Sequence, residues 1–144
     1  MLAVEPRAGL RAATPHRASS ENRWRLSRHQ EGRIHYQTGR GPRCLAVTYA
    51  VAGDYVLLRL PEFNDVTHYA PGRPVVLEVS DAHSTLQVRG VAHVAGSRHA
   101  RLVEQATFPE PMPVGVATRV ICLPLDDVVA VPSLDRVVLE TSSA

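Results

Sequence analysis

Short stretches of alternating or continuous apolar residues, separated by turn residues, fill the chain from Gly32 to Leu60. Residues 33–37 (RIHYQ) alternate, residues 43–52 (RCLAVTYAVA) are mostly apolar, and residues 55–60 (YVLLRL) follow a Gly-Asp pair. Alternation with a period of two is typical of half-buried strands, and the Gly, Pro and Asp residues between the stretches favour tight turns. The pattern predicts a meander of three antiparallel strands.

The pattern breaks over residues 61–71 (PEFNDVTHYAP), where the period of two is lost. Asn and Asp side chains cap helices by accepting a hydrogen bond from a backbone N–H of the first turn. We therefore expect a short helix here, capped by Asn64 or Asp65 and ending before Pro71. Renewed apolar runs with turn residues between them predict four further strands, at residues 74–79, 84–94, 118–125 and 128–139.

Helical patterns are found in two other places. Residues 24–31 (WRLSRHQE) are predicted to form two helical turns with Trp24 and Leu26 facing inward, and Gly32 is expected to end them. Residues 97–108 (SRHARLVEQATF) are weakly helical, and the prolines that follow favour extended backbone.

The chain of 144 residues has the length of a single domain. Residues 1–22 mix Pro, Gly, Ser and Arg without periodicity, so we expect a disordered basic tail followed by one domain over residues 23–144. Six or seven strands in a domain of this size predict a mainly β fold. A small closed barrel is favoured because closure removes the exposed edges of apolar strands.

Composition and charge exclude several classes of protein. The chain is 44% hydrophobic and 21% charged, with a net charge of +2, which is typical of a globular domain. The charge is concentrated in residues 1–33, and the nearly neutral remainder argues against a broad nucleic-acid-binding surface. No apolar run is long enough to cross a membrane or to form a signal-peptide core, so we expect a cytoplasmic protein.

The residue types limit the chemistry that the chain can perform. The basic residues are all arginine, so an anion site must use guanidinium groups or backbone N–H groups. The histidines show no metal-ligand spacing, and no metal site is predicted. Cys44 and Cys122 lie in apolar runs, which favours two buried thiols in a reducing compartment.

Several segments occur in an order and spacing that resemble one known family. They are residues 32–36 (GRIHY), 41–49 (GPRCLAVTY), 53–60 (GDYVLLRL), 72–79 (GRPVVLEV) and 88–92 (VRGVA). They lie within the run from Glu31 to Val94, nearly half of the chain, and this run resembles the pyridoxamine 5′-phosphate oxidase-like FMN-binding split-barrel proteins, especially small actinobacterial members. The resemblance implies a homodimeric split β-barrel of six to seven antiparallel strands, Greek-key in type, with one to three short helices and FMN in a groove between subunits.

The resemblance also implies a set of cofactor-binding positions. In the family, the second strand runs past the flavin ring with its backbone groups, the third strand and the following loop hold the phosphate, and a polar residue on a later strand reaches the cofactor. The matching positions in this chain are Arg43, Leu45 and Ala46 for the ring, Arg59, Leu60 and Asn64 for the phosphate, and Thr85 for the later strand.

The phosphate end departs from the family pattern at three positions. Leu60 stands where the family has Thr, Phe63 where a Gly is common, and Asp65 where a Lys is usual. An FMN phosphate carries nearly two negative charges, and an Asp beside it adds repulsion. We therefore expect an atypical phosphate site.

Three functions follow from these observations. The first is an FMN-dependent oxidoreductase in which the flavin performs the redox chemistry and no catalytic side chain is required. The second is a non-catalytic dimeric module that binds another small molecule, such as a deazaflavin or haem. The third is a dimeric regulatory protein without a ligand.

Overall fold

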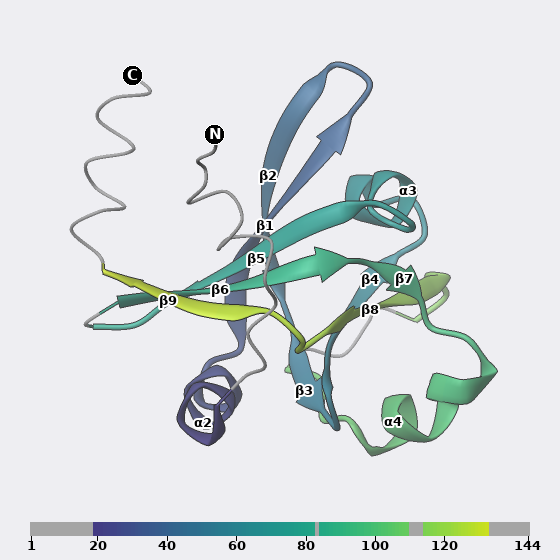
Figure 1. Cartoon of the computed structure of the whole chain (residues 1–144). Coiled ribbons are helices and arrows are strands. Elements are labelled where there is room, and N and C mark those ends of the chain that lie inside the picture. The colour runs from purple at the N-terminus through teal and green to yellow at the C-terminus, as the bar shows by residue number, and fades with distance from the viewer. Residues whose placement is uncertain (1–18, 83, 110–113, 133–144) are drawn as a thin grey trace, which may run out of the picture.

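The computed structural model describes residues 19–82, 84–109 and 114–132, and these form two antiparallel sheets (Figure 1). The five-stranded sheet has the order β2 (Gly41–Thr48), β1 (Glu31–Thr38), β5 (Pro74–Ser80), β6 (Ser84–Val91) and β9 (Val128–Pro132). The four-stranded sheet has the order β3 (Ala50–Ala52), β4 (Tyr55–Pro61), β8 (Thr118–Pro124) and β7 (His93–Val94). The predicted mainly β fold is confirmed.

One short helix precedes the strands and others connect them. They are α2 (Ser20–Arg28), α3 (Asp65–Tyr69), α4 (Ala100–Gln105) and a 3-10 turn at Ser97–His99. Of the two predicted caps of α3, Asn64 and Asp65, it is Asn64 whose side chain accepts a hydrogen bond from the Val66 backbone N–H. In the part of the chain that the structure describes, no helix is long and apolar enough to cross a membrane.

Two of the predicted strands are each divided between the sheets. The run 43–52 becomes β2 and β3 with a break at Tyr49, and the run 84–94 becomes β6 and β7 with a break at Ala92. Strands that pass from one sheet to another form the corners of such two-layered β structures. The apolar pattern continues through each corner, so the sequence alone predicted single strands.

The core lies between the two sheets. It is formed by side chains at alternate positions along the strands, which point inward. In β1 and β5 these are Ile34, Tyr36, Val75, Leu77 and Val79, all of them buried. In β4, three consecutive residues are buried, because Leu57 is covered on the outer face as well. Full burial of one such aliphatic side chain stabilises the fold by about 1.5–3 kcal/mol, so this core holds the sheets together.

The first helix differs from its prediction. It spans Ser20–Arg28 instead of residues 24–31, and Ser19 caps it by accepting a hydrogen bond from the Asn22 N–H. It ends early because Glu31 already pairs with Thr48 in the β1–β2 ladder. Residues 19–22 therefore belong to the helix and not to the predicted tail, of which residues 1–18 lie outside the described residues.

The orientation of this helix was predicted half correctly. Leu26 is buried, and the Tyr49 hydroxyl donates a hydrogen bond to its carbonyl oxygen at 2.6 Å. Trp24, which was predicted to face inward, is 57% exposed, and the Arg28 guanidinium lies over its ring at 4.8 Å. The predictions for residues 110–113 and 133–139 lie outside the described residues.

The two cysteines lie in different environments, and the prediction for Cys44 was wrong. Cys122 is buried on β8, as expected, whereas Cys44 is exposed on the edge strand β2. Alternation along β2 turns Leu45 and Val47 toward the core and Cys44 away from it. The apolar run hid this alternation.

This difference leads to a prediction for thiol reactivity. Burial raises the pKa of the Cys122 thiol from its ordinary value of 9.0 to about 11, which reduces its thiolate fraction about a hundredfold near neutral pH. We expect Ellman's reagent to modify one thiol quickly in the native protein and two in the unfolded protein. The Cys44→Ser variant is expected to show no fast reaction when folded, and a fast reaction of that variant would contradict the burial of Cys122.

The same shift has a consequence at high pH. Above the ordinary thiol pKa, the unfolded chain ionises Cys122 while the folded chain keeps it protonated. The contribution of this group to stability is therefore fully present below pH 9.0 and is lost as the pH rises through about 11.

Candidate ligand-binding groove

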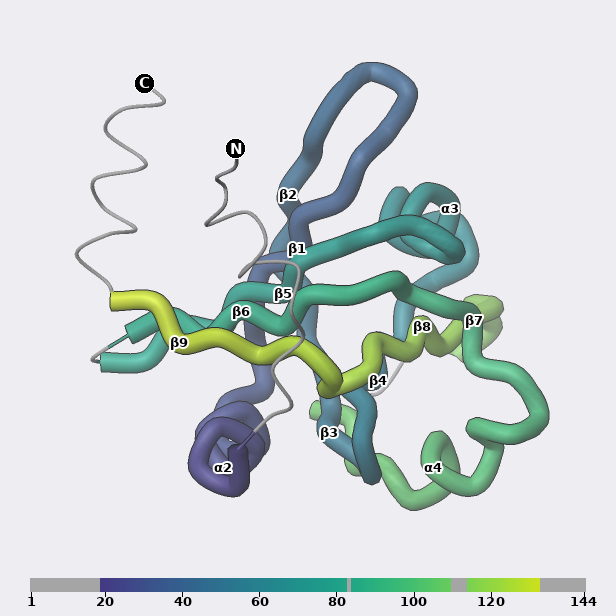
Figure 2. The backbone as a smooth tube through the Cα atoms, viewed as in Figure 1, coloured from purple at the N-terminus to yellow at the C-terminus, as the bar shows by residue number. Residues whose placement is uncertain are grey.

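The strands β2 and β4 diverge and form a fork. β3 continues from β2 and pairs with the start of β4, where Ala50 lies opposite Leu57. On the other side of Tyr49, β2 pairs with β1 and is the edge strand of the larger sheet. Figure 2 shows the β1–β2 hairpin leaving the body of the molecule while β4 continues toward α3.

Backbone groups of both strands face this fork. The Tyr49 N–H donates to the Gln30 carbonyl at 2.9 Å, and bonding alternates along an antiparallel ladder. The N–H and C=O groups of Ala46 and Thr48 therefore point away from β1. The Glu62 N–H donates to the Ala117 carbonyl at 3.0 Å, and the same alternation turns the backbone N–H and C=O of Arg59 away from β8 toward the fork.

A groove of about 810 Å³ begins at the fork and extends past the start of β1 to the end of α2. This volume lies within the range of small-molecule and cofactor pockets, roughly 300–1,000 Å³. Its lining residues come from five neighbouring segments and are Arg28, His29, Gln30, Glu31, Gly32, Arg33, Ala46, Val47, Thr48, Arg59, Leu60, Glu78 and Ser80.

Three of the predicted cofactor-binding residues line this groove: Ala46, Arg59 and Leu60. Leu60 is almost fully buried and belongs to the core, so it offers apolar surface where the family has a hydroxyl. The Arg59 side chain lies on the opposite face of β4 from Leu60, and its guanidinium is 4.4 Å from the centre of the Phe108 ring. The backbone of Arg59 is thus better placed for a ligand than its side chain.

The other four predicted residues do not line the groove. Leu45 packs against the core, and the buried Thr85 hydroxyl pairs with the hydroxyl of Ser80 at 3.2 Å. Because Ser80 itself lines the groove, Thr85 supports its wall from behind. The remaining two, Arg43 and Asn64, lie near α3.

The residues near α3 already bind one another. Asn64 uses its side-chain oxygen to cap α3, at 2.8 Å from the Val66 nitrogen. The Asp65 carboxylate accepts a hydrogen bond from the Tyr36 hydroxyl at 3.3 Å and lies 3.6 Å from the Arg43 guanidinium. Burial, followed by the Asp65 charge and hydrogen bond, raises the pKa of Tyr36 above its usual value. The ion pair with Asp65 balances the positive charge of Arg43 within the protein.

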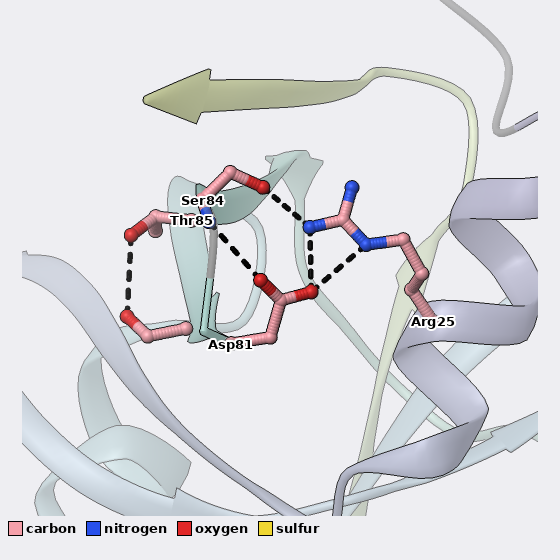
Figure 3. A network of polar contacts seen from close by, with 5 residues as sticks. Arg25, Asp81, Ser84 and Thr85 are labelled. Atoms are coloured by element: carbon pink, nitrogen blue, oxygen red, sulfur yellow. Dashed lines mark hydrogen bonds and ion pairs between the residues drawn. The ribbon is translucent and has the colours of Figure 1, made fainter. Parts of the chain in front are cut away.

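A network that was not predicted attaches α2 to the turn between β5 and β6 (Figure 3). The Arg25 guanidinium donates two hydrogen bonds to one Asp81 oxygen, at 2.9 and 2.6 Å, and a third to the Ser84 hydroxyl. The other Asp81 oxygen accepts from the Ser84 backbone N–H at 3.0 Å. Since Arg28 is the last residue of α2 and His29 follows it, this network holds one wall of the groove in place.

A second network spans the outer face of the larger sheet. His35 Nε2 lies 2.7 Å from one Glu78 oxygen, and the Gln87 amide donates to the other at 3.1 Å. Arg89 in turn donates to the Gln87 side-chain oxygen at 2.8 Å. This network holds the Glu78 carboxylate, which lines the groove, in a fixed position.

Comparison with known proteins supports the fold. No model of a protein family matches the sequence, and no curated protein matches it. An FAD-binding protein from Mycobacterium smegmatis is similar in structure, with 20% identity, a TM-score of 0.66 and coverage of 81% of this chain and 98% of that chain. An FAD- and haem-binding protein from the same organism has 11% identity, a TM-score of 0.66 and coverage of 83% and 73%.

A protein assigned as a pyridoxamine 5′-phosphate oxidase from Corynebacterium glutamicum is also similar, with 14% identity and a TM-score of 0.59. The match covers 80% of this chain and 90% of that chain. This chain has the split-barrel fold. It is the fold of the pyridoxamine 5′-phosphate oxidase-like and flavin-binding proteins, as the sequence resemblance implied. At such low identity the similarity establishes the split-barrel fold alone.

Proposed function

We propose that this split barrel binds a flavin nucleotide, with FMN as the expected cofactor, in the groove at the fork, and acts as a flavin-dependent oxidoreductase. The observation that carries the proposal is the pair of strand edges facing the groove. Ala46 and Thr48 on one side and Arg59 on the other direct backbone N–H and C=O groups into a space of cofactor size.

The chemistry of these groups suits a flavin ring. The isoalloxazine ring is flat and carries carbonyl and N–H groups along one edge, which backbone groups of an open strand edge can bind. The small side chain of Ala46 leaves space beside this edge, and Leu60 supplies apolar surface. When bound, a flavin supplies the redox chemistry, and the protein orients it and limits its contact with water.

The proposal includes a homodimer in the cytoplasm, where both thiols stay reduced. The groove is open on one side in the single chain, and a second copy is the expected cover, as the family resemblance implied. Light scattering is expected to give twice the chain mass of 15.7 kDa. A particle with the mass of one chain would contradict this part of the proposal.

The absorbance spectrum of the purified protein tests the proposal, followed by fluorescence titration with FMN, FAD and haemin. We expect flavin absorbance bands, or flavin binding in the titration. The Ala46→Trp variant is expected to weaken flavin binding at least tenfold by filling the groove, whereas Gln37→Trp, at an exposed position of β1 outside the groove, is expected to leave it unchanged.

Absence of flavin bands together with absence of flavin binding would overturn the proposed function. Binding of haemin with a Soret band, and of no flavin, would favour the alternative of a binding module for another ligand. Equal effects of the two Trp variants would show that the flavin binds outside the groove.

A further inference from the structure

We infer that the ligand lies in the groove with its phosphate at the α2 end, beside Arg28 and Arg33, and that Asp65 keeps the phosphate away from the α3 end. This inference rests on the proposed function, because it specifies the direction of the flavin in the same groove. It also reverses the position that the sequence resemblance implied for the phosphate.

The α2 end carries two exposed arginines, and the guanidinium of one of them, Arg28, also lies over the Trp24 ring. Arg28 and Arg33 both line the groove and are exposed. Within the described residues, no salt bridge joins either of them to a carboxylate. Two guanidinium groups can bind phosphate oxygens through charge-assisted, bidentate hydrogen bonds, and the chain has no lysine for this purpose.

Two acidic residues, Glu31 and Glu78, line the groove beside these arginines. Glu78 lies opposite Arg33 in the β1–β5 ladder, and its carboxylate oxygens contact His35 and Gln87. Glu31 is exposed at the start of β1, so solvent screens its charge. The C-terminal end of α2 carries a partial negative charge that by itself would repel a phosphate, and Arg28 in the last turn offsets it.

The α3 end has the opposite character. The cation beside α3 is Arg43, which the resemblance placed near the flavin ring; it is paired with Asp65, and neither residue lines the groove. A phosphate at this end has to displace the Asp65 carboxylate from Arg43 and would still lie beside it, where like charges repel. Leu60 adds apolar surface on this side, which suits the flavin ring better than a phosphate.

The two ends can be separated by comparing FMN with riboflavin, which has the same ring and no phosphate. The quantity measured is the ratio of the riboflavin Kd to the FMN Kd, from fluorescence titration of the full chain. The double variant Arg28→Ala/Arg33→Ala removes the proposed phosphate site. Arg43→Ala removes the cation at the α3 end. Arg40→Ala is a control at an exposed arginine of the β1–β2 turn.

We expect the unmodified protein to prefer FMN over riboflavin by roughly tenfold to a hundredfold, the size of a charge-assisted hydrogen bond. The double variant is expected to lose this preference while its riboflavin Kd stays unchanged, which also shows that the variant is folded. Arg43→Ala and Arg40→Ala are expected to keep the preference within about twofold of the unmodified protein.

Other outcomes would overturn the inference. Loss of the preference in Arg43→Ala, but not in the double variant, would place the phosphate at the α3 end. Equal affinity of the unmodified protein for FMN and riboflavin would show that no phosphate site exists, although flavin binding itself would stand. Absence of binding of both flavins would instead overturn the proposed function on which the inference rests.

Discussion

Replacement of Gly32 by alanine is expected to lower the free energy of unfolding by about 1–3 kcal/mol, and replacement by valine by more. A Cβ atom at this position would lie 2.7 Å from the Glu78 carbonyl oxygen, and within 3.2 Å of side-chain atoms of Leu77 and Val79. The closest of these atoms is backbone, so β5 itself must move away from β1. Because Gly32 also lines the groove, we expect flavin binding to weaken in the same variants.

Gly39 offers a matched control for this prediction. It lies in the exposed turn between β1 and β2, and a Cβ atom there would meet no atom within 4 Å. Gly39→Ala is expected to change the free energy of unfolding by less than about 0.5 kcal/mol. Urea unfolding followed by circular dichroism measures both variants, and equal stabilities of Gly32→Ala and Gly39→Ala would contradict the close approach of β1 and β5.

Loss of the Arg25 side chain is expected to lower the free energy of unfolding by about 1–3 kcal/mol, because it leaves the Asp81 carboxylate without its arginine in a partly buried position. The two side chains are only 16% and 20% exposed and share a bond at 2.6 Å. We also expect weaker flavin binding in Arg25→Ala, since the network positions the end of α2 that lines the groove.

The same helix supplies the control. Arg23 forms an ion pair with Asp54 at 3.0 Å, but these side chains are 36% and 65% exposed. Solvent screens such a pair, so Arg23→Ala is expected to cost less than about 1 kcal/mol and to leave flavin binding unchanged. If thermal unfolding gave the same loss for both variants, the special role of the Arg25 network would be refuted.

Local patterns in the sequence determined most of the secondary structure of this protein. The alternation in residues 33–37, the turn residues after it and the run 55–60 specified β1 and β4, because the side-chain period and the turn chemistry depend on near neighbours only. A cap at Asn64 or Asp65 was predictable for the same reason, and the structure has it at Asn64. The order and spacing of these segments were sufficient to indicate the split barrel.

The tertiary structure alone decided where the long strands change sheets. At Tyr49 the residue pattern stays apolar, but Tyr49 and Ala50 are buried in succession because the inner face changes at the corner. The exposure of Cys44 has a related cause, since it depends on which face of β2 the core covers. Local sequence patterns do not record which strands become neighbours.

The groove was likewise only partly readable from the sequence. The resemblance indicated Ala46, Arg59 and Leu60, which line it, because the fold fixes where the backbones of these strands lie. The pairing of Arg43 with Asp65, and the place of Arg28 and Arg33 at the other end, depend on contacts between distant segments. The sequence by itself determined which charges the chain carries, and the packing of the strands decided which of them face a ligand.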